Sequence, residues 1–264
     1  MIARSYLYIP ANNASMLEKS HTRGADALII DFEDAVMASE KNKARQVFSK
    51  WISSAPQSQQ IWVRINADSI EADLAVADIP QVTGIVVPKA SVDNMSLVSQ
   101  SLKKVGQLSA LIESAASILD ARAIAQVAKV DFLQIGLLDL RAELSLGDDA
   151  SSPTLNFALS MLVLASAGAG INQPVAPMYP DFNDEAGLRA TCKSFKSGGF
   201  FGRSCIHPSQ IAIVNEEFST NADELAHARA VLDAVAKSNG VAIDENGKMI
   251  DAASVRIAQG IIAR

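Results

Sequence analysis

LSALIE (residues 108–113) and VDFLQIGLLD (residues 130–139) are two apolar runs that each end on a carboxylate, Glu113 and Asp139. The residues between them, 116–128, have a helical pattern, so the two runs are predicted to be successive parallel strands. In α/β barrels the chemistry lies at the carboxyl ends of the strands. Two carboxylates on successive strands there would suit a hard divalent cation, most naturally Mg²⁺.

Further apolar runs carry polar residues at the same end. They are DALIIDFED (26–34) with Asp31, Glu33 and Asp34, IWVRIN (61–66) with Arg64 and Asn66, and GIVVPK (84–89) with Lys89. Because continuous apolar runs of this length are typical of strands buried on both faces, a parallel sheet is expected. The polar residues are therefore expected to meet at one edge of that sheet.

Eight strands alternating with helices predict one (β/α)₈ TIM barrel over residues 1–240, followed by a C-terminal helical extension over 241–264. The remaining strand candidates are SYLYIP (5–10), NQPVAPMY (172–179) and FGRSCIHP (201–208). Two prolines interrupt the seventh of the eight strands. The extension reads as a turn followed by an amphipathic helix, and we expect it to act as a lid or as an oligomerisation segment. Helices are predicted at 14–23, 40–52, 69–78, 92–104, 116–128, 153–167, 184–198, 208–217 and 222–237.

Composition excludes several classes of protein. The chain has 264 residues, 49% of them hydrophobic, and a formal net charge of −6. It lacks the basic clustering of a nucleic-acid-binding protein. The apolar stretch FALSMLVLASAGAG (157–170) is too short and too rich in Ser and Gly to span a bilayer, and no signal-peptide pattern is visible. Two cysteines, Cys192 and Cys205, are typical of reduced core thiols, so a cytoplasmic protein is expected.

The quoted motifs, with several others, resemble the citrate lyase β-subunit (CitE-like) branch of the HpcH/HpaI aldolase superfamily. The resemblance covers nearly the whole chain in the family's order. Its stretches are RSYLYIPANNASML (4–17), GADALIIDFEDAV (24–36), VRIN (63–66), GIVVPKAS (84–91), LIESAASILDARAIA (111–125), IGLLDLRAELSLG (135–147), GGFFGRSCIHPSQIAIVNEEF (198–218) and GKMIDAASVRIA (247–258).

The resemblance implies a Mg²⁺-dependent barrel that cleaves or forms a carbon–carbon bond in a CoA thioester of the citryl-, malyl- or citramalyl-CoA type. By position, Glu113 and Asp139 match the metal ligands, and Arg64 matches the arginine that grips the keto-acid carboxylate. Glu33 and Asp34 match the acidic pair near the water shell of the metal. The expected partners are an acyl-CoA and a 2-keto acid, and a homotrimer or homohexamer is expected. Acyl-carrier and transferase subunits could join it in a lyase complex.

The chemistry agrees with these assignments. Cleavage of a β-hydroxy thioester yields a 2-keto acid and a thioester enolate, and a cation on Glu113 and Asp139 would act as a Lewis acid on the substrate hydroxyl. Arg64 would hold the adjacent carboxylate in a bidentate fork. Lys89 is a candidate substrate contact, and no covalent nucleophile is required.

Four positions depart from the family pattern. Ala11 and Asn13 lie in a loop expected near the acyl-CoA or keto acid, and Leu138 stands where an acid usually precedes the metal aspartate. Asn172–Gln173 replaces the usual Ile-Asp in a loop that could contact substrate. A substrate shifted from that of the typical family member is therefore plausible.

Structural interpretations of the same residues remain open. Glu113 could cap the helix that follows it, and Asp139 could form a local salt bridge or cap. Arg64 could pair with Glu33 rather than with substrate, and Lys89 could form a structural ion pair. Two other functions also remain: an aldolase acting on free 2-keto-hydroxy acids without CoA, and a catalytically silent, thioester-binding subunit of a lyase complex.

Overall fold

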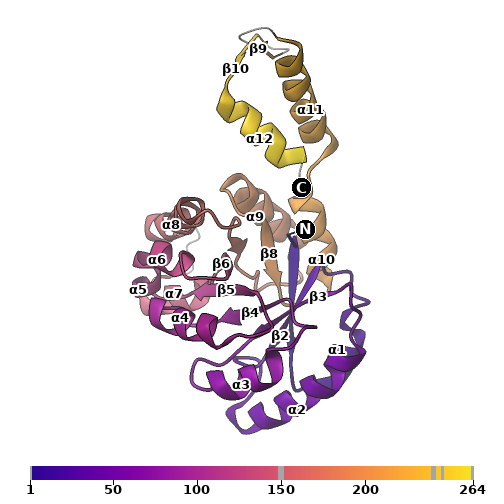
Figure 1. The fold of residues 1–264 in the computed structure, drawn as a ribbon, viewed down its shortest axis with the longest axis vertical. Helices are drawn as coiled ribbons and strands as arrows, with labels where there is room; N and C mark the ends of the chain where they lie inside the picture. The colour runs from indigo at the N-terminus through magenta and orange to yellow at the C-terminus, as the bar shows by residue number, and fades with distance from the viewer. Residues whose placement is uncertain (1, 148–151, 239–241, 245–246, 263–264) are drawn as a thin grey trace. The chain divides into compact units, whose positions relative to one another are not determined.

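Eight parallel strands close into a barrel in the order β1 to β8 (Figure 1). The computed structural model describes residues 2–147, 152–238, 242–244 and 247–262. The strands are β1 Ser5–Pro10, β2 Ala27–Asp31, β3 Gln60–Arg64, β4 Gly84–Val87, β5 Gln107–Ile112, β6 Val130–Ile135, β7 Val175–Ala176 and β8 Gly202–Cys205. The predicted (β/α)₈ barrel is confirmed, including its short, proline-flanked seventh strand.

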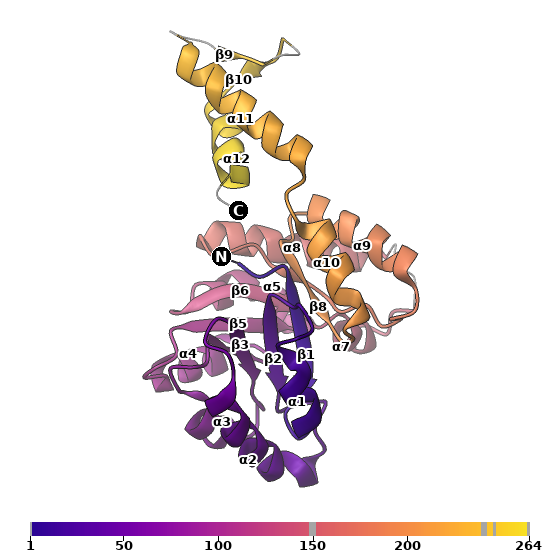
Figure 2. The same ribbon diagram turned by 90° about the vertical axis from the view of Figure 1, so that its right-hand side faces the viewer.

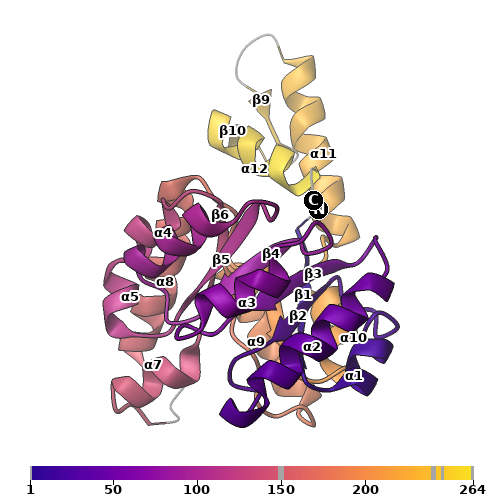
Figure 3. The same ribbon diagram turned by 60° about the horizontal axis from the view of Figure 1, so that its bottom comes forward.

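Helices surround the strands (Figure 3). The helices of the barrel are α1 Ala14–Ser20, α2 Lys41–Trp51, α3 Ile70–Ala77, α4 Val92–Ser101, α5 Ala115–Leu119, α6 Ala121–Ala125, α7 Leu137–Glu143, α8 Pro153–Ala169, α9 Glu185–Ser197 and α10 Ser209–Phe218. Two short 3₁₀ helices, Ala38–Glu40 and Ile52–Ser54, flank α2. The predicted helix 116–128 is divided at Asp120 into α5 and α6.

The barrel interior is filled by aromatic side chains from alternate strand positions. Trp62 meets Phe132 edge-on, with ring centroids 4.9 Å apart, and also contacts Tyr6. Gly84 on the neighbouring strand leaves room for the indole, since a Cβ at this position would overlap the Trp62 ring. This layer closes the barrel below the carboxyl ends of the strands, where the polar residues lie.

One predicted strand differs from the structure in a way that matters for the site. The run 130–139 leaves β6 at Ile135 and enters α7 directly after Gly136. Asp139 therefore lies in the first turn of a helix rather than at a strand end. The periodicity of a short apolar run is the same for a buried strand and a buried helical turn. For this reason the strand predicted from the sequence continued to residue 139.

The C-terminal residues form a second compact unit, which begins at Ser219. It contains α11 Ala222–Lys237, a hairpin of β9 Ala242–Ile243 and β10 Met249–Ile250, and α12 Ala252–Ile262 (Figure 2). Ala228 and Val231 of α11 pack with Ala258 of α12 in a small core of their own. The sequence placed the boundary at residue 241, but this packing joins α11 to the C-terminal unit. The hairpin was not predicted.

Among the described residues, none of the helices combines the length and apolarity needed to cross a membrane.

Candidate active site

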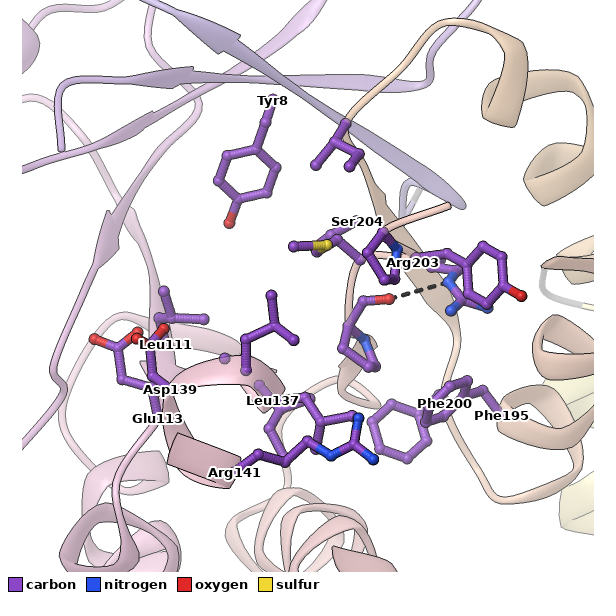
Figure 4. A pocket seen from close by; sticks show the side chains of 18 of the residues that line it. Tyr8, Leu111, Glu113, Leu137, Asp139, Arg141, Phe195, Phe200, Arg203 and Ser204 are labelled. Atoms are coloured by element: carbon purple, nitrogen blue, oxygen red, sulfur yellow. Dashed lines mark hydrogen bonds between the residues drawn. The ribbon is translucent and has the colours of Figure 1, made fainter. Parts of the chain in front are cut away.

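A cavity of about 880 Å³ opens at the carboxyl ends of the strands within the barrel unit. The side chains that line it come from several strands and from the helices that follow them (Figure 4). Among them are Tyr8, Arg64, Glu113, Asp139, Arg141 and Ser204. The strand ends therefore bring together residues that lie far apart in the sequence.

Glu113 follows β5 and is buried, with 7% of its surface exposed. Its Oε1 accepts a hydrogen bond from the backbone N–H of Lys89 at 2.6 Å. Burial raises the pKa of Glu113 to about 7; the bond from Lys89 lowers it, and the charges of Glu33 and Asp139 raise it further. A carboxylate in this setting is stabilised in its charged form by a bound cation.

Gly136 places Asp139 beside Glu113. A Cβ on Gly136 would lie 2.7 Å from Cβ and 2.9 Å from Oε2 of Glu113, and 3.7 Å from Oδ2 of Asp139. Figure 4 shows the two carboxylates on the same wall of the pocket. The absent side chain at residue 136 thus leaves the space in which both carboxylates meet.

These two carboxylates fit a magnesium ion. Among the described residues there is no group of three or more His, Cys, Asp or Glu side chains able to hold a metal. Mg²⁺ in proteins is commonly held by one or two carboxylates, with water and substrate oxygens as its other ligands. The donor set of Glu113 and Asp139 matches that mode, and Asp139 makes no hydrogen bond or ion pair to another described residue that would compete.

Arg64 is held by the acidic cluster after β2. Its Nε and Nη2 donate to Oδ1 and Oδ2 of Asp31 at 2.8 and 2.6 Å, forming a bidentate pair. Its Nη1 lies 3.2 Å from Glu33 and 3.1 Å from Asp34. The bidentate edge expected to grip a substrate is therefore occupied by Asp31, and Nη1 already donates to Oδ2 of Asp34, so a substrate carboxylate at Nη1 would share that nitrogen with Asp34.

Glu33 is buried next to this arginine. Burial raises its pKa, the charge of Arg64 lowers it, and Asp34 raises it again, so that the pKa lies above its usual value. Its Oε2 lies 3.2 Å from Nη1 of Arg64 as an ion pair, without the geometry of a hydrogen bond to a described residue. Asp34 is more open: its side chain is 67% exposed and lines the pocket.

Lys89 contributes through its backbone. Its side chain is 67% exposed, and Nζ lies 3.4 Å from Oε1 of Glu33. The side chain is not part of the pocket wall, whereas the backbone N–H orients Glu113. A direct contact between the Lys89 side chain and substrate stays a prediction.

Sequence reasoning missed a chain of hydrogen bonds in the barrel interior that joins Tyr8, Gln134 and Ser109. The hydroxyl of Tyr8 donates to Oε1 of Gln134 at 3.1 Å, and Nε2 of Gln134 donates to Ser109 at 2.9 Å. Tyr6 and Tyr8 lie two residues apart on β1 and therefore point to the same face, so the period of two could have placed both inside. Burial raises the pKa of Tyr8 well above its usual range, which keeps the phenol protonated as a donor.

The four departures from the family pattern lie in different places. Ala11 is fully buried, and the side chain of Asn13 caps α1 by accepting from the N–H of Met16. Leu138 is half exposed and lines the pocket beside Asp139. Asn172 bonds to Asp131 at the start of β6, at the opposite end of the barrel from the site, and neither Asn172 nor Gln173 lines the pocket.

Comparison with known proteins gives a consistent result. A profile of the HpcH/HpaI aldolase/citrate lyase family matches residues 4–208, and a profile described as a C–C bond lyase of the TIM-barrel fold matches residues 159–264. A (3S)-malyl-CoA thioesterase of Cereibacter sphaeroides is 33% identical, covering 99% of this chain and 94% of its own. The mitochondrial citramalyl-CoA lyase of Homo sapiens is 27% identical over 98% of this chain and 84% of its own.

Among solved structures, the CitE protein of Mycobacterium tuberculosis in complex with magnesium, acetoacetate and coenzyme A superimposes with a TM-score of 0.81. The two sequences are 26% identical, and the match covers 98% of this chain and 97% of that one. Since the family profile spans most of the barrel and the similarity to relatives extends over nearly the full length, this chain belongs to the HpcH/HpaI aldolase/citrate lyase family.

Proposed function

We propose that this protein is a Mg²⁺-dependent carbon–carbon lyase. It cleaves or forms a β-hydroxyacyl-CoA thioester of the citryl-, malyl- or citramalyl-CoA type, giving a 2-keto acid and an acyl-CoA. The observation that carries the proposal is the pair Glu113 and Asp139, which meet at Gly136 on the wall of the pocket. The CitE structure named above contains magnesium, acetoacetate and coenzyme A, which supports the same chemistry here.

Each residue of the site has a distinct task in this proposal. Glu113 and Asp139 hold the ion, which when bound supplies Lewis-acid stabilisation of substrate oxygens. Arg64 directs its Nη1 toward the substrate carboxylate and fixes its orientation while Asp31 holds the other edge of the guanidinium. Glu33, whose pKa lies above its usual value, is the group that can carry a proton. Asp34 orients water beside it.

A second candidate is hydrolysis of the same thioester. It is favoured by the 33% identical relative, which is named a (3S)-malyl-CoA thioesterase. In a hydrolase the same metal site would activate water against the thioester carbonyl, and the products would be free coenzyme A and a hydroxy acid. Lyase chemistry instead leaves the thioester intact in an acyl-CoA and releases a 2-keto acid.

One experiment separates these functions. The purified protein is incubated with citryl-CoA, malyl-CoA, citramalyl-CoA and free 2-keto-hydroxy acids, with Mg²⁺ or with EDTA. Free thiol and 2-keto acid are then measured separately. A lyase produces keto acid without free thiol, and a hydrolase produces thiol without keto acid. Turnover of the free acids alone would favour the aldolase, and no turnover of any substrate would favour a silent binding subunit.

We also propose a closed homo-oligomer, with a trimer as the first expectation. Ile257 and Ile262 of α12 remain 65% and 42% exposed, so the helix has apolar surface beyond what its own small core buries. A cytoplasmic setting is supported by Cys192 and Cys205, which are buried free thiols, the state expected in a reducing compartment. Acyl-carrier and transferase subunits are further candidate partners.

A further inference from the structure

Three arginines line the pocket, and they differ in how their donors are used. Arg64 is bound by Asp31, Glu33 and Asp34, as described above. Arg203 donates to the carbonyl of Pro177 at 3.0 Å and to Thr191 at 2.8 Å, and it lies over two aromatic rings. Arg141 has no such partners: its Nε and Nη2 are buried and bond to no described residue.

The edge of Arg141 that lacks a partner is the one that binds carboxylates. Nε–H and one Nη2–H of a guanidinium point in parallel and match the two oxygens of a carboxylate. Arg64 uses this same edge on Asp31, at 2.8 and 2.6 Å, in the same pocket. The pocket therefore contains one example of the complete pair and one arginine with the equivalent edge open.

The surroundings of Arg141 make this open edge costly without a ligand. Figure 4 shows its guanidinium extending away from Glu113 and Asp139, on the side of the pocket where Phe195 and Phe200 lie. The local salt bridge expected between Asp139 and its neighbours is not formed among the described residues. A charged donor kept out of water with neither a hydrogen bond nor an opposite charge is strongly unfavourable. An anion that enters this part of the pocket would give Arg141 both a hydrogen-bond acceptor and an opposite charge.

We infer that Arg141 is a second carboxylate-binding residue, and that the organic-acid half of the substrate is a 2-keto dicarboxylate rather than a monocarboxylate. The inference rests on the proposed lyase function, because it places the first carboxylate of that acid at the Arg64 side of the site. Arg141 then contacts the distal carboxylate and selects for it. Phe195 and Phe200, which line the pocket on this side, make the surroundings of such a charge-assisted pair less polar than water and so strengthen it.

Calorimetry with matched pairs of keto acids tests the inference without any turnover. Binding to the full-length protein with Mg²⁺ is measured for oxaloacetate against 2-oxobutyrate, and for 2-oxoglutarate against 2-oxovalerate. Members of each pair have the same number of carbons and differ in the distal carboxylate. The wild type is expected to bind at least one dicarboxylate about tenfold or more tightly than its partner, as expected for a charged hydrogen-bonded pair.

Arg141→Gln should remove that preference and leave binding of the monocarboxylates unchanged. Arg141→Lys should restore part of it, since lysine keeps the charge but lacks the planar fork. Arg122→Gln, which changes an exposed arginine on α6, is the control and should behave as the wild type. Melting temperatures of all variants verify that the barrel remains folded.

Several results would overturn the inference. One is a wild type that binds both members of each pair with equal affinity. Another is an Arg141→Gln variant in which the affinities for all four acids fall equally. A third is an Arg141→Gln variant that binds coenzyme A more weakly relative to dephospho-coenzyme A but binds the keto acids as the wild type does. That result would show that the anion bound by Arg141 is a phosphate. If the wild type binds no keto acid at all, the proposed lyase function fails together with the inference. If it binds them and Arg141→Gln changes nothing, only the inference fails.

Discussion

The backbone N–H of Lys89 donates to Oε1 of Glu113 at 2.6 Å, so the segment after β4 orients the carboxylate that follows β5. The next unit of the barrel supplies Gly136 and Asp139 on the other side of the same carboxylate. Glu113 is thus positioned by the two units that flank it along the barrel. The second oxygen of Glu113 faces Gly136, on the side where Asp139 lies.

Glu113→Gln and Asp139→Asn should each abolish Mg²⁺ binding, with the fold retained. Because burial and the charges of Glu33 and Asp139 disfavour the ionised form of Glu113, the metal-free Glu113→Gln protein should melt no lower than the metal-free wild type. Calorimetry with Mg²⁺ and thermal melts with and without the ion measure both effects. Unchanged Mg²⁺ affinity in both variants would remove these residues from the metal site.

Gly136→Ala should weaken Mg²⁺ binding by about 10- to 100-fold, comparable to the loss of a residue that orients a metal ligand. The added Cβ would lie 2.7 Å from Cβ of Glu113 and must displace that side chain. Gly106→Ala is the matched control, since a Cβ there would meet nothing within 4 Å. Equal Mg²⁺ affinities in the two variants would show that the close approach at residue 136 does not matter.

Arg64→Lys should lower kcat/KM roughly 30-fold, which corresponds to a loss of about 2 kcal/mol of transition-state binding. Lysine lacks the planar fork with which Arg64 can bind Asp31 and the substrate together. Asp31→Asn separates the structural share of this loss. It weakens the pair with Arg64 but keeps the guanidinium itself. We therefore expect a clear fall in the melting temperature, with a smaller loss of kcat/KM than in Arg64→Lys. Wild-type kcat/KM in Arg64→Lys would make Arg64 a structural residue.

Asp78 should stabilise the barrel above about pH 4. Burial raises its pKa, but hydrogen bonds from the N–H groups of Val105, Lys103 and Lys104 outweigh it and hold the pKa below its usual value. A lowered folded-state pKa means that the stabilisation is present above the unfolded-state value and is lost as the pH falls through the folded-state value.

Asp78→Ala should therefore cost about 1 kcal/mol at pH 7, a value reduced for solvent exposure. The difference between wild type and variant should shrink as the pH falls toward 3. Chemical denaturation of both proteins at a series of pH values measures it. A difference that stays constant over this range would contradict the assignment.

Truncation after Phe218 should change assembly more than barrel stability. The cut follows the boundary between the two compact units and removes α11 and α12 together, whereas a cut at residue 241 would remove α12 alone and expose Ala228 and Val231. Light scattering is expected to show fewer subunits per particle than in the full-length protein. Turnover should also fall if the unit encloses the substrate. A truncated protein that keeps both its oligomeric state and its turnover would contradict this role.

The strand pattern made most of the fold predictable. Buried parallel strands carry continuous apolar runs, and their carboxyl ends meet at one edge, so the amino-acid sequence alone places Glu113 together with the acids after β2. The boundary at Ser219 could not be found in this way, and the sequence pattern placed it at residue 241 instead. Whether α11 covers the barrel or packs on α12 depends on the fit between their small side chains, which the amphipathic pattern of either helix leaves undefined.

The sequence by itself determined the barrel and the family, and it identified Glu113 and Asp139 as the candidate metal ligands, because these depend on local apolar periodicity and on motifs that run along the chain. Only the tertiary structure decided that Asp31 occupies the fork of Arg64, that Asp139 lies on a helix, and that Arg141 keeps an open edge in the pocket. These features depend on the register between β2 and β3 and on how α7 leaves Gly136. Contacts between side chains that are distant in sequence follow from such packing, and no periodicity along the chain records it.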